Sequence, residues 1–404
     1  MGGNLTAGAA TTTLRSEGFD GKLVIVGEEP HAPYERPPLS KDYLRGESKA
    51  EDTLLHPRSW YDEAGVEMRL GVRARLLDPT QRAVELEDGE RVSFDRLLIA
   101  TGGRNRTLAV PGHDLDGIHD LRRIEDADRI RAEASAGRKV VIVGAGFIGS
   151  EVAASLRHLG VEVEIVEFFE APLLRVLGPE VARVYEGIHR DNGVRFHFGQ
   201  AVESFQGDRR VEAVVTSKGT RVEGDFVVVG VGIQPNIEWL DGSGLEIDNG
   251  VAVDEFCRTN VEGVFAAGDV ANHWHPLFDR RMRVEHWDNA LKQGAAAARN
   301  MMGLETVFDD PHWFWSDQYQ HNLQYMGFAT EWEHLVVRGS LEERSFVAFY
   351  LAQGVVKAVV GLDRGKDVRR SAGLIRARRP FAPSLLRDED VDLKNLATQA
   401  AEGV

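Results

Sequence analysis

The chain has 404 residues, of which 43% are hydrophobic and 28% are charged, and this composition predicts a globular protein of two or three domains. The formal net charge of −16 argues against a general nucleic-acid binder. Cys257 is the only cysteine, which excludes a disulfide framework, a CxxC redox pair and a cysteine-ligated iron–sulfur cluster within the chain.

The chain opens on a glycine turn that leads into a helix over residues 2–15, followed by a strand over residues 22–29. The turn has the pattern G-x-N-x-x-A, with Gly2, Asn4 and Ala7 in the places of a dinucleotide fingerprint. Asn tolerates positive φ, and Ala is a common substitute at the third place. An apolar strand should precede such a turn and is absent, so either the true start lies upstream or the chain lacks that strand.

The predicted strand ends on Glu28, an acid placed to bind a ribose, and a proline-rich loop follows over residues 30–44. Arg36 and Lys41 lie on either side of two prolines in this loop. Because proline fixes the backbone, the loop suits a clamp that holds the two cations against a dinucleotide. Read without other information, it is equally well a solvated connection.

A complete dinucleotide unit lies at residues 138–167. An apolar run leads directly into Gly144, Gly146 and Gly149, a helical pattern follows, and a second apolar strand ends on Glu167. This context turns a weak G-x-G-x-x-G match into a strong one, since the glycines serve the tight turn, the close approach of a pyrophosphate and helix packing. Glu167 can accept from a ribose 2′-OH and repels a 2′-phosphate, which favours NAD over NADP. The alternative is a close-packed turn that binds nothing.

Further strands are predicted over residues 66–99, with a turn at Asp88-Gly89, and a buried strand over residues 261–274 ends near one acid, Asp269. That acid could cap a helix or bind a polyol hydroxyl. A helix over residues 284–301 carries Trp287 in its first turn.

Three histidines, His273, His275 and His286, lie close together in the sequence. Since no acid or thiol lies at ligand spacing beside them, they are predicted to be solvated or packed, and no metal site is predicted.

The chain changes character at about residue 309. The aromatic stretch 313–319 is followed by a pattern typical of three antiparallel strands. An arginine cluster follows these strands and comprises Arg369, Arg370, Arg376, Arg378 and Arg379. It is either a solvated helix face or a docking patch for an acidic partner.

Two dinucleotide units predict two dinucleotides. One is NAD(H), and the other is most simply FAD, so the expected chemistry is hydride transfer between nicotinamide and flavin. The predicted fold class is α/β, with two Rossmann-like dinucleotide-binding domains of the glutathione-reductase type and a C-terminal α+β domain. The predicted boundaries are 1–110 with 236–308 for the FAD-binding domain, 111–235 for the NAD-binding domain and 309–404 for the C-terminal domain.

The motifs PYERPPLSK, ATGG, GAGFIGSE, AAGDV, VEHWDNA and WFWSDQY occur in this order. In this the chain resembles the NADH-dependent ferredoxin reductases of aromatic-ring dioxygenase systems. These belong to the FAD/NAD-linked reductase superfamily, beside putidaredoxin-reductase-like and apoptosis-inducing-factor-like proteins. The resemblance covers nearly the whole chain and lacks only the first strand.

The resemblance implies the residues that bind each cofactor. For FAD these are Gly2, Asn4, Ala7, Glu28 at the ribose, Arg36 at the phosphates, Lys41 near flavin N5, Val72, Arg106, Asp269 at the ribityl chain, and His286 and Trp287 at the flavin. For NAD they are Gly144, Gly146, Ile148, Gly149 and Glu151, with Glu167 and Arg175 at the adenosine half, Gly232 along the nicotinamide path, and Trp315. Lys41, paired with Glu151, and Trp287 would be the catalytic residues.

The resemblance also implies a function. NADH would reduce FAD, and the flavin would pass single electrons to a [2Fe–2S] ferredoxin that serves an oxygenase in aromatic hydrocarbon catabolism. An NADH oxidase, quinone reductase or rubredoxin reductase of the same fold is one alternative, and a flavin-poor interaction or redox-sensing protein is another. We expect a cytoplasmic monomer or homodimer without membrane or nucleic-acid contacts, because the sequence has no transmembrane run and no signal-peptide pattern.

Overall fold

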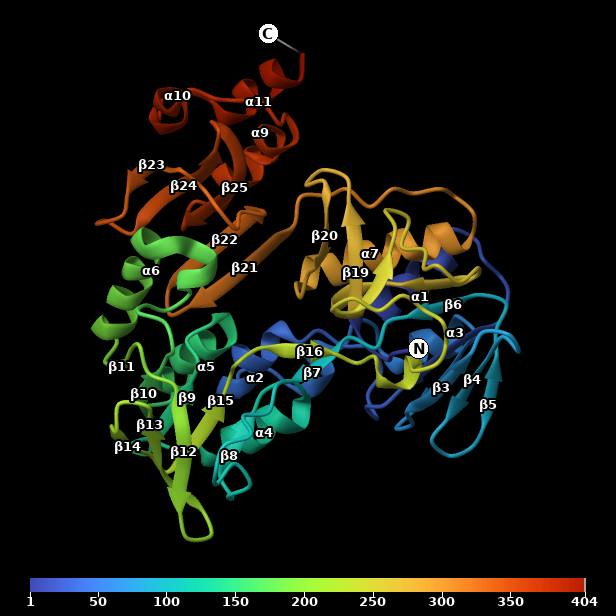
Figure 1. Ribbon diagram of the computed structural model, residues 1–404, viewed down its shortest axis with the longest axis horizontal. Coiled ribbons are helices and arrows are strands. Elements are labelled where there is room, and N and C mark those ends of the chain that lie inside the picture. The colour runs from blue at the N-terminus through green and yellow to red at the C-terminus, as the bar shows by residue number, and fades with distance from the viewer. Residues whose placement is uncertain (403–404) are drawn as a thin grey trace. The chain divides into compact units, whose positions relative to one another are not determined.

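The computed structural model describes residues 1–402, and helices and strands alternate through most of them (Figure 1). This architecture confirms the predicted α/β class. The chain divides into two compact units, the first made of residues 1–36, 50–104 and 233–312 and the second of residues 37–49, 105–232 and 313 onward. The finer division into three domains stays a prediction.

The helices of the first unit are α1 (Leu5–Ser16), η2 (Ala50–Thr53), α3 (Arg58–Glu63), η3 (Glu238–Leu240), η4 (Gly268–Val270) and α7 (Trp287–Met301). Its strands, of which β7 ends one residue past the boundary, are β1 (Leu23–Gly27), β2 (Val66–Leu70), β3 (Ala74–Asp78), β4 (Ala83–Leu86), β5 (Arg91–Ser93), β6 (Leu97–Ile99), β7 (Gly103–Asn105), β16 (Ile233–Pro235), β17 (Val251–Val253), β18 (Val264–Ala266), β19 (Ala271–His275) and β20 (Arg280–Arg283).

The first unit contains several short sheets. Strands β1 and β2 pair in parallel, as do β6 and β18, whereas β3, β4 and β5 form an antiparallel meander. The predicted turn at Asp88-Gly89 connects β4 to β5, and Gly89 has the positive φ of 85° that a tight hairpin requires. One apolar core, which includes Val26, Ile99 and Val264, lies under the β1, β6 and β18 strands.

The N-terminus lies between two of these sheets. The Met1 amine donates to Leu98 O at 2.8 Å, Ala100 N donates to Met1 O at 2.7 Å, and Gly2 N donates to Val26 O at 2.8 Å. Met1 and Gly2 therefore bridge β1 and β6. They lie where a dinucleotide-binding unit has its first strand, and α1 begins at Leu5 after the glycine turn, as the sequence predicted.

The helices of the second unit are η1 (Pro37–Ser40), α2 (Asp42–Arg45), α4 (Ile124–Glu133), α5 (Phe147–His158), α6 (Leu174–Asp191), α8 (Gly365–Arg370), α9 (Ala372–Arg376), α10 (Pro383–Arg387) and α11 (Leu393–Glu402). Its strands are β8 (Ile118–Asp120), β9 (Lys139–Val143), β10 (Glu162–Val166), β11 (Arg195–His197), β12 (Val202–Gly207), β13 (Val211–Thr216), β14 (Arg221–Glu223), β15 (Phe226–Val229), β21 (Trp313–Gln318), β22 (His321–Gly327), β23 (His334–Ser340), β24 (Ser345–Ala352) and β25 (Val355–Leu362).

Two larger sheets organise the second unit. The order β11-β10-β9-β15-β8 is parallel throughout, and the buried residues of β9 and β10 are almost all Val and Ile, as a sheet covered on both faces requires. The C-terminal sheet, β21-β22-β25-β24-β23, is antiparallel. It includes the aromatic stretch as β21, so it extends beyond the three strands that the sequence predicted.

Helix α6 lies against the C-terminal sheet within the same core. The Tyr350 hydroxyl on β24 donates to Leu177 O of this helix at 2.8 Å. The helix bends at Gly178, where φ is 72°, and the Trp332 ring leaves no room there for a side chain. None of the described helices is both long and apolar enough to span a membrane.

Candidate functional site

The glycine turn between β9 and α5 gives each glycine a different role. Gly144 has a φ of 98°, and a Cβ on it would lie 2.5 Å from Gly230 O. A Cβ on Gly149 would lie 2.1 Å from Gly144 O, so this glycine allows helix and turn to pack closely. A Cβ on Gly146 would meet no described atom within 4 Å. The open side of the turn is therefore at Gly146, beside the N-terminus of α5, where backbone N–H groups and the helix dipole favour a phosphate.

Glu167 follows β10 and is 8% exposed. Its carboxylate accepts from Ala145 N at 2.5 Å and from Phe169 N at 2.8 Å. The acid predicted to bind ribose thus lies directly at the glycine turn, held by two backbone donors.

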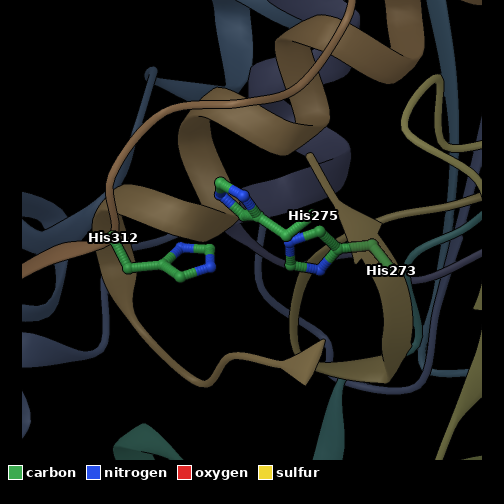
Figure 2. Close-up of side chains that lie close together, drawn as sticks. All are labelled: His273, His275 and His312. Carbon is green, nitrogen blue, oxygen red and sulfur yellow. The ribbon is translucent and has the colours of Figure 1, made fainter. Parts of the chain in front are cut away.

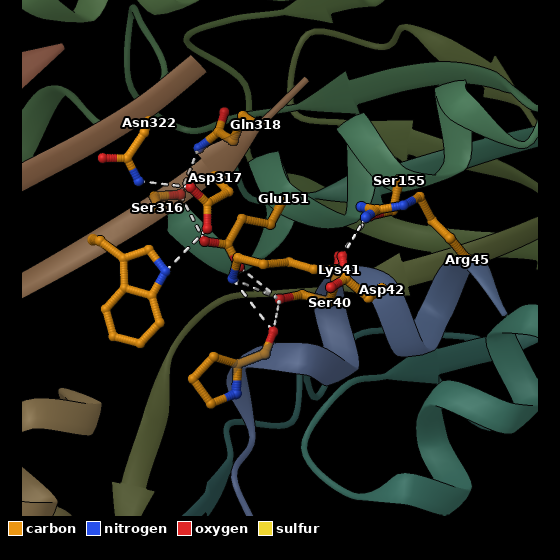
Figure 3. A network of polar contacts seen from close by, with 12 residues as sticks. Ser40, Lys41, Asp42, Arg45, Glu151, Ser155, Ser316, Asp317, Gln318 and Asn322 are labelled. Carbon is orange, nitrogen blue, oxygen red and sulfur yellow. Dashed lines mark hydrogen bonds and ion pairs between the residues drawn. The ribbon is translucent and has the colours of Figure 1, made fainter. Parts of the chain in front are cut away.

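A buried polar network surrounds Glu151 on α5, which is 3% exposed (Figure 3). Lys41 Nζ and the Ser40 hydroxyl each donate to Glu151 Oε2 at 2.6 Å. The Ser316 hydroxyl donates to the other oxygen, Oε1, also at 2.6 Å. The predicted Lys41–Glu151 pair is thus present. A buried carboxylate is stable only when charged and hydrogen-bonding partners satisfy it, and this one has both.

The network continues away from Glu151 through neutral groups. Gln318 Nε2 donates to Ser316 Oγ at 3.0 Å, and Gln318 Oε1 accepts from His189 Nε2 at 2.8 Å. Burial lowers the pKa of His189 to about 4, so the ring is neutral at pH 7. Its other nitrogen, Nδ1, then accepts from the Tyr319 hydroxyl at 3.1 Å. In this series of hydrogen bonds each group can donate in only one direction. The Ser316 hydroxyl therefore donates its proton to Glu151.

The remaining predicted residues of the second unit are near the surface. Arg106 N donates to Gly232 O at 2.9 Å, which joins two of them. Trp315 Nε1 donates to Asp317 Oδ2 at 3.0 Å, and its ring stacks on Trp313 with centroids 5.3 Å apart.

Ile148 in the first turn of α5 is 47% exposed, which is unusual for so apolar a side chain. Arg175 at the start of α6 is exposed, and its guanidinium lies over the Phe169 ring at 5.8 Å. Both residues lie on elements that flank the glycine turn or the segment after Glu167.

The first unit repeats the turn in modified form. Gly2 has a φ of 114°, and a Cβ there would lie 2.0 Å from Ala100 O, so only glycine fits. Asn4 Nδ2 donates to Ala100 O at 2.7 Å and thereby ties the turn to the end of β6. Ala7 is buried in α1. Val72 N donates to Gly27 O at 3.0 Å beside the end of β1.

Two of the charged residues predicted to hold FAD, Glu28 and Arg36, are ion-paired. Glu28 pairs with Arg73 at 2.5 Å. Arg36 pairs with Glu29 at 2.6 Å and donates to the Tyr34 hydroxyl at 2.9 Å. Burial lowers the pKa of Arg36, but the oxygens of Tyr34 and Glu29 raise it by more, so the guanidinium stays charged.

Asp269 in η4 and the start of α7 lie near Arg36 within the same unit. The Asp269 carboxylate favours the charged forms of both Arg36 and His286. Burial nevertheless lowers the pKa of His286 to about 4, which keeps this residue neutral at the N-terminus of α7. The Trp287 indole lies near the Glu35 carboxyl. The structure thus gathers four predicted residues, from the loop, η4 and α7, in one place.

The family follows from this arrangement and from direct comparison. Residues 1–294 match the family described as pyridine nucleotide-disulphide oxidoreductase, and residues 313–397 match the one described as reductase C-terminal. The chain belongs to the pyridine nucleotide-disulphide oxidoreductase family. It is therefore an oxidoreductase, and its family uses a flavin and a nicotinamide nucleotide, as the two glycine turns predicted.

Similar proteins support a narrower assignment. The chain is 35% identical to putidaredoxin reductase of Pseudomonas putida over 96% of this chain and 93% of that protein. It is 35% identical to the ferredoxin–NAD(+) reductase component of the anthranilate 1,2-dioxygenase system of Burkholderia cepacia, over 98% and 97%. A solved structure of the covalent putidaredoxin reductase–putidaredoxin complex matches with a TM-score of 0.95 and 34% identity, over 99% and 97%. These matches confirm the resemblance stated from the motifs.

Sequence reasoning missed Ser40, Ser316, Gln318 and His189 in the network around Glu151. Ser40 directly precedes Lys41, which was predicted, so its position in the sequence could have identified it as part of the network. The others lie 38 to 167 positions from Glu151, and no local pattern marks them.

A matched pair of glycine substitutions tests the nucleotide site. Gly146→Ala should leave stability unchanged, because its Cβ meets only open space, but should weaken NADH binding by about tenfold or more, since the methyl group occupies the side where a pyrophosphate would approach. Gly149→Ala should instead destabilise the fold by roughly 1–3 kcal/mol through its clash with Gly144 O. Thermal unfolding and NADH titration measure both effects. Equal NADH affinity in Gly146→Ala would contradict the site.

Neutral His189 makes stability depend on pH. The unfolded chain binds a proton on this residue below about pH 6.5, whereas the folded chain does so only near pH 4. Stability should therefore fall as the pH falls between these values. The free energy of unfolding should therefore fall by roughly 2–3 kcal/mol less in His189→Gln than in the unmodified protein between about pH 7 and about pH 4.5. Urea unfolding at the two pH values measures this difference. Exposed His334→Gln is the control and should retain the full dependence. Identical pH profiles for the two variants would refute the buried neutral state.

Proposed function

We propose that this chain is an NADH-dependent, FAD-containing reductase that passes electrons to a [2Fe–2S] ferredoxin of an oxygenase system. The observation that carries the proposal is the pair of glycine turns, each followed by an acid at the end of the next strand, in a chain without a redox cysteine pair. A cytoplasmic location and an oxygenase that acts on an aromatic or hydrophobic compound belong to the same proposal.

The choice of NADH rests on Glu167. Its carboxylate lies at the turn that contains Gly146, where the adenosine end of a nucleotide would meet the protein. A ribose 2′-OH can donate to a carboxylate, whereas a 2′-phosphate would be repelled by it. Arg175 and Ile148 flank the same turn from α6 and α5 and would contact the nucleotide's adenosine half.

The choice of FAD rests on the first unit. The turn at Gly2 requires glycine, Glu28 follows the next strand, and Arg36 lies near Asp269. A flavin with a second nucleotide half would use the turn and the acid together, which FMN could not. Bound FAD would accept a hydride from the nicotinamide and release its electrons one at a time. Asn4, Ala7, Val72, His286 and Trp287 would line that site.

Lys41 and Glu151 would act as a fixed charge pair in the second unit. The Glu151 carboxylate is satisfied by Ser40, Lys41 and Ser316, so it holds the ammonium in one position. Such a fixed ammonium would stabilise negative charge that develops on a neighbouring group without reorganisation. Gly232 and Trp315 would complete the nicotinamide path. Arg106, whose backbone N–H donates to Gly232 O, would contact FAD.

Electrons would leave the flavin without a disulfide relay. Cys257 is the only cysteine in the sequence, it is fully buried, and burial raises the pKa of its thiol far above its ordinary value. A buried neutral thiol is inert. An electron acceptor must therefore take electrons from the flavin itself.

A ferredoxin is the acceptor that the similar proteins suggest. One of them carries putidaredoxin in its solved complex, and another is named the ferredoxin–NAD(+) reductase component of a dioxygenase system. On this chain, Arg376 and Arg378 are exposed in the arginine cluster at and after α9. This cluster could receive an acidic ferredoxin even though the chain as a whole is acidic.

The central experiment uses the purified protein with its flavin. Anaerobic NADH should bleach the flavin absorption, and NADH with a [2Fe–2S] ferredoxin should reduce the ferredoxin. Raised salt should slow the ferredoxin step, because docking is electrostatic, while NADH-driven ferricyanide reduction serves as the control. A protein that binds no flavin, or that turns over oxygen or quinone rapidly but fails with every ferredoxin offered, would overturn the proposal.

Cofactor preference has its own test. Glu167→Ala combined with Phe168→Arg should raise activity with NADPH relative to NADH, because the repelling carboxylate is replaced by a cation beside the same turn. Phe168 is 66% exposed, so this change costs little packing. The matched control is Glu170→Ala combined with Phe168→Arg, which removes the same charge three positions further on. An unchanged NADH-to-NADPH ratio in the Glu167 variant would refute its role.

A further inference from the structure

Three buried histidines meet in the first unit (Figure 2). His273 and His275 lie on β19, and His312 lies on the irregular segment that follows α7. Their exposed fractions are 1%, 0% and 4%. One potential ligand nitrogen from each lies within 4.8 Å of the other two. The sequence grouped His273 and His275 with His286, whereas the structure groups them with His312.

The strand explains why two of these rings converge. Successive side chains of a strand point to opposite faces, so His273 and His275 share one face of β19. Their ring centroids lie 5.4 Å apart, and the His312 ring lies 5.4 Å from the first and 4.8 Å from the second. Figure 2 shows the His312 ring pointing from its segment toward the two rings on the strand.

The ring nitrogens of His273 lack regular hydrogen-bond partners among the described residues. The Met282 backbone lies near this ring, but within the described residues neither ring nitrogen makes a hydrogen bond of normal geometry. A buried polar atom left unsatisfied costs about 1–3 kcal/mol, so a simple packed core would favour an apolar residue here. A bound ion would satisfy the nitrogen that faces the other two rings.

The surroundings supply two further features of a metal site. His275 Nε2 lies 2.9 Å from Asp310 O, and a ring N–H held by a carbonyl leaves Nδ1 as the ligand, as is usual for histidines that bind metals. The Met282 thioether lies 3.0 Å from His312 Nε2. The thioether therefore lies beside one of the three imidazoles, and Met282 pairs with His273 across strands β19 and β20.

We propose that His273, His275 and His312, with Met282 as the fourth ligand, form a binding site for monovalent copper. Thioether ligands favour Cu(I) over harder ions. Imidazole and thioether ligands bring no negative charge to this buried site, so a monovalent ion costs less to bury among them than a divalent one. Around a single ion the nitrogens would be about 3.4 Å apart at bond lengths near 2.05 Å. Closure therefore needs a movement of no more than about 1.4 Å from the 4.8 Å spacing, which His312 can supply because its segment is neither helix nor strand.

The test uses the full chain with its flavin under anaerobic conditions, and its outcome is independent of the electron acceptor. Cu(I) alone, offered against a colorimetric chelator, should bind at one ion per chain. His312→Gln should lose this uptake, and exposed His334→Gln should keep it. Flavin content and thermal unfolding of each variant establish that it is folded. No uptake by the unmodified protein, or equal uptake by His312→Gln, would overturn the proposal.

Two further measurements do not depend on how well the His312 variant folds. X-ray absorption of the copper-loaded protein should show histidine nitrogens and one sulfur around the ion; a sulfur-free or imidazole-free ion would refute the site. Met282→Leu conserves volume and should weaken Cu(I) binding by about tenfold or more while leaving Zn²⁺ binding unchanged. Binding of Zn²⁺ but not Cu(I) by the unmodified protein would contradict the assignment of the ion.

Discussion

The carboxylate of Glu151 is the constraint on which the second unit depends. It lies on α5 just after the glycine turn, and it is satisfied by Ser40, Lys41 and Ser316 from two other parts of the chain. An unpaired carboxylate in this place would cost several kcal/mol, so the proline-rich loop and β21 must both be in position before α5 can bury it. The residue that gives the site its charge therefore also fixes the segments around it.

The two glycine turns show how much of a dinucleotide site is backbone geometry. Gly144 and Gly149 permit close approach within one turn of chain, and Gly2 does the same against Ala100. In the first turn, Met1 and Gly2 are hydrogen-bonded to the β1 and β6 segments on either side. Asn4 adds a side-chain hydrogen bond to the same carbonyl, a tie that a glycine in its place could not make. A degenerate fingerprint is thus compatible with the turn that the motif describes.

Sequence reasoning succeeded where the determining contacts are local. The roles predicted for Gly144, Gly146 and Gly149 follow from a strand, a turn and a helix within one short segment. The structure shows the close packing expected at Gly144 and Gly149, and the approach of a pyrophosphate at Gly146 stays a prediction. It failed for Ser316 and His189, because their partners come from distant parts of the chain and no periodicity marks them. The Lys41–Glu151 pair was available only through the resemblance, since spacing alone does not join residues 110 positions apart. His312 was missed for the same reason as Ser316.

The contrast between His189 and His273 explains why the second of these points to a ligand. Both rings are almost fully buried, so both need partners for two nitrogens. His189 has Gln318 on one side and Tyr319 on the other, which is a complete solution within the protein. His273 has two histidines and aromatic rings around it and, in the described part of the chain, no such solution. The same fold provides hydrogen-bond partners for both nitrogens of His189. The unsatisfied nitrogens of His273 are therefore better explained by a bound ion than by imperfect packing.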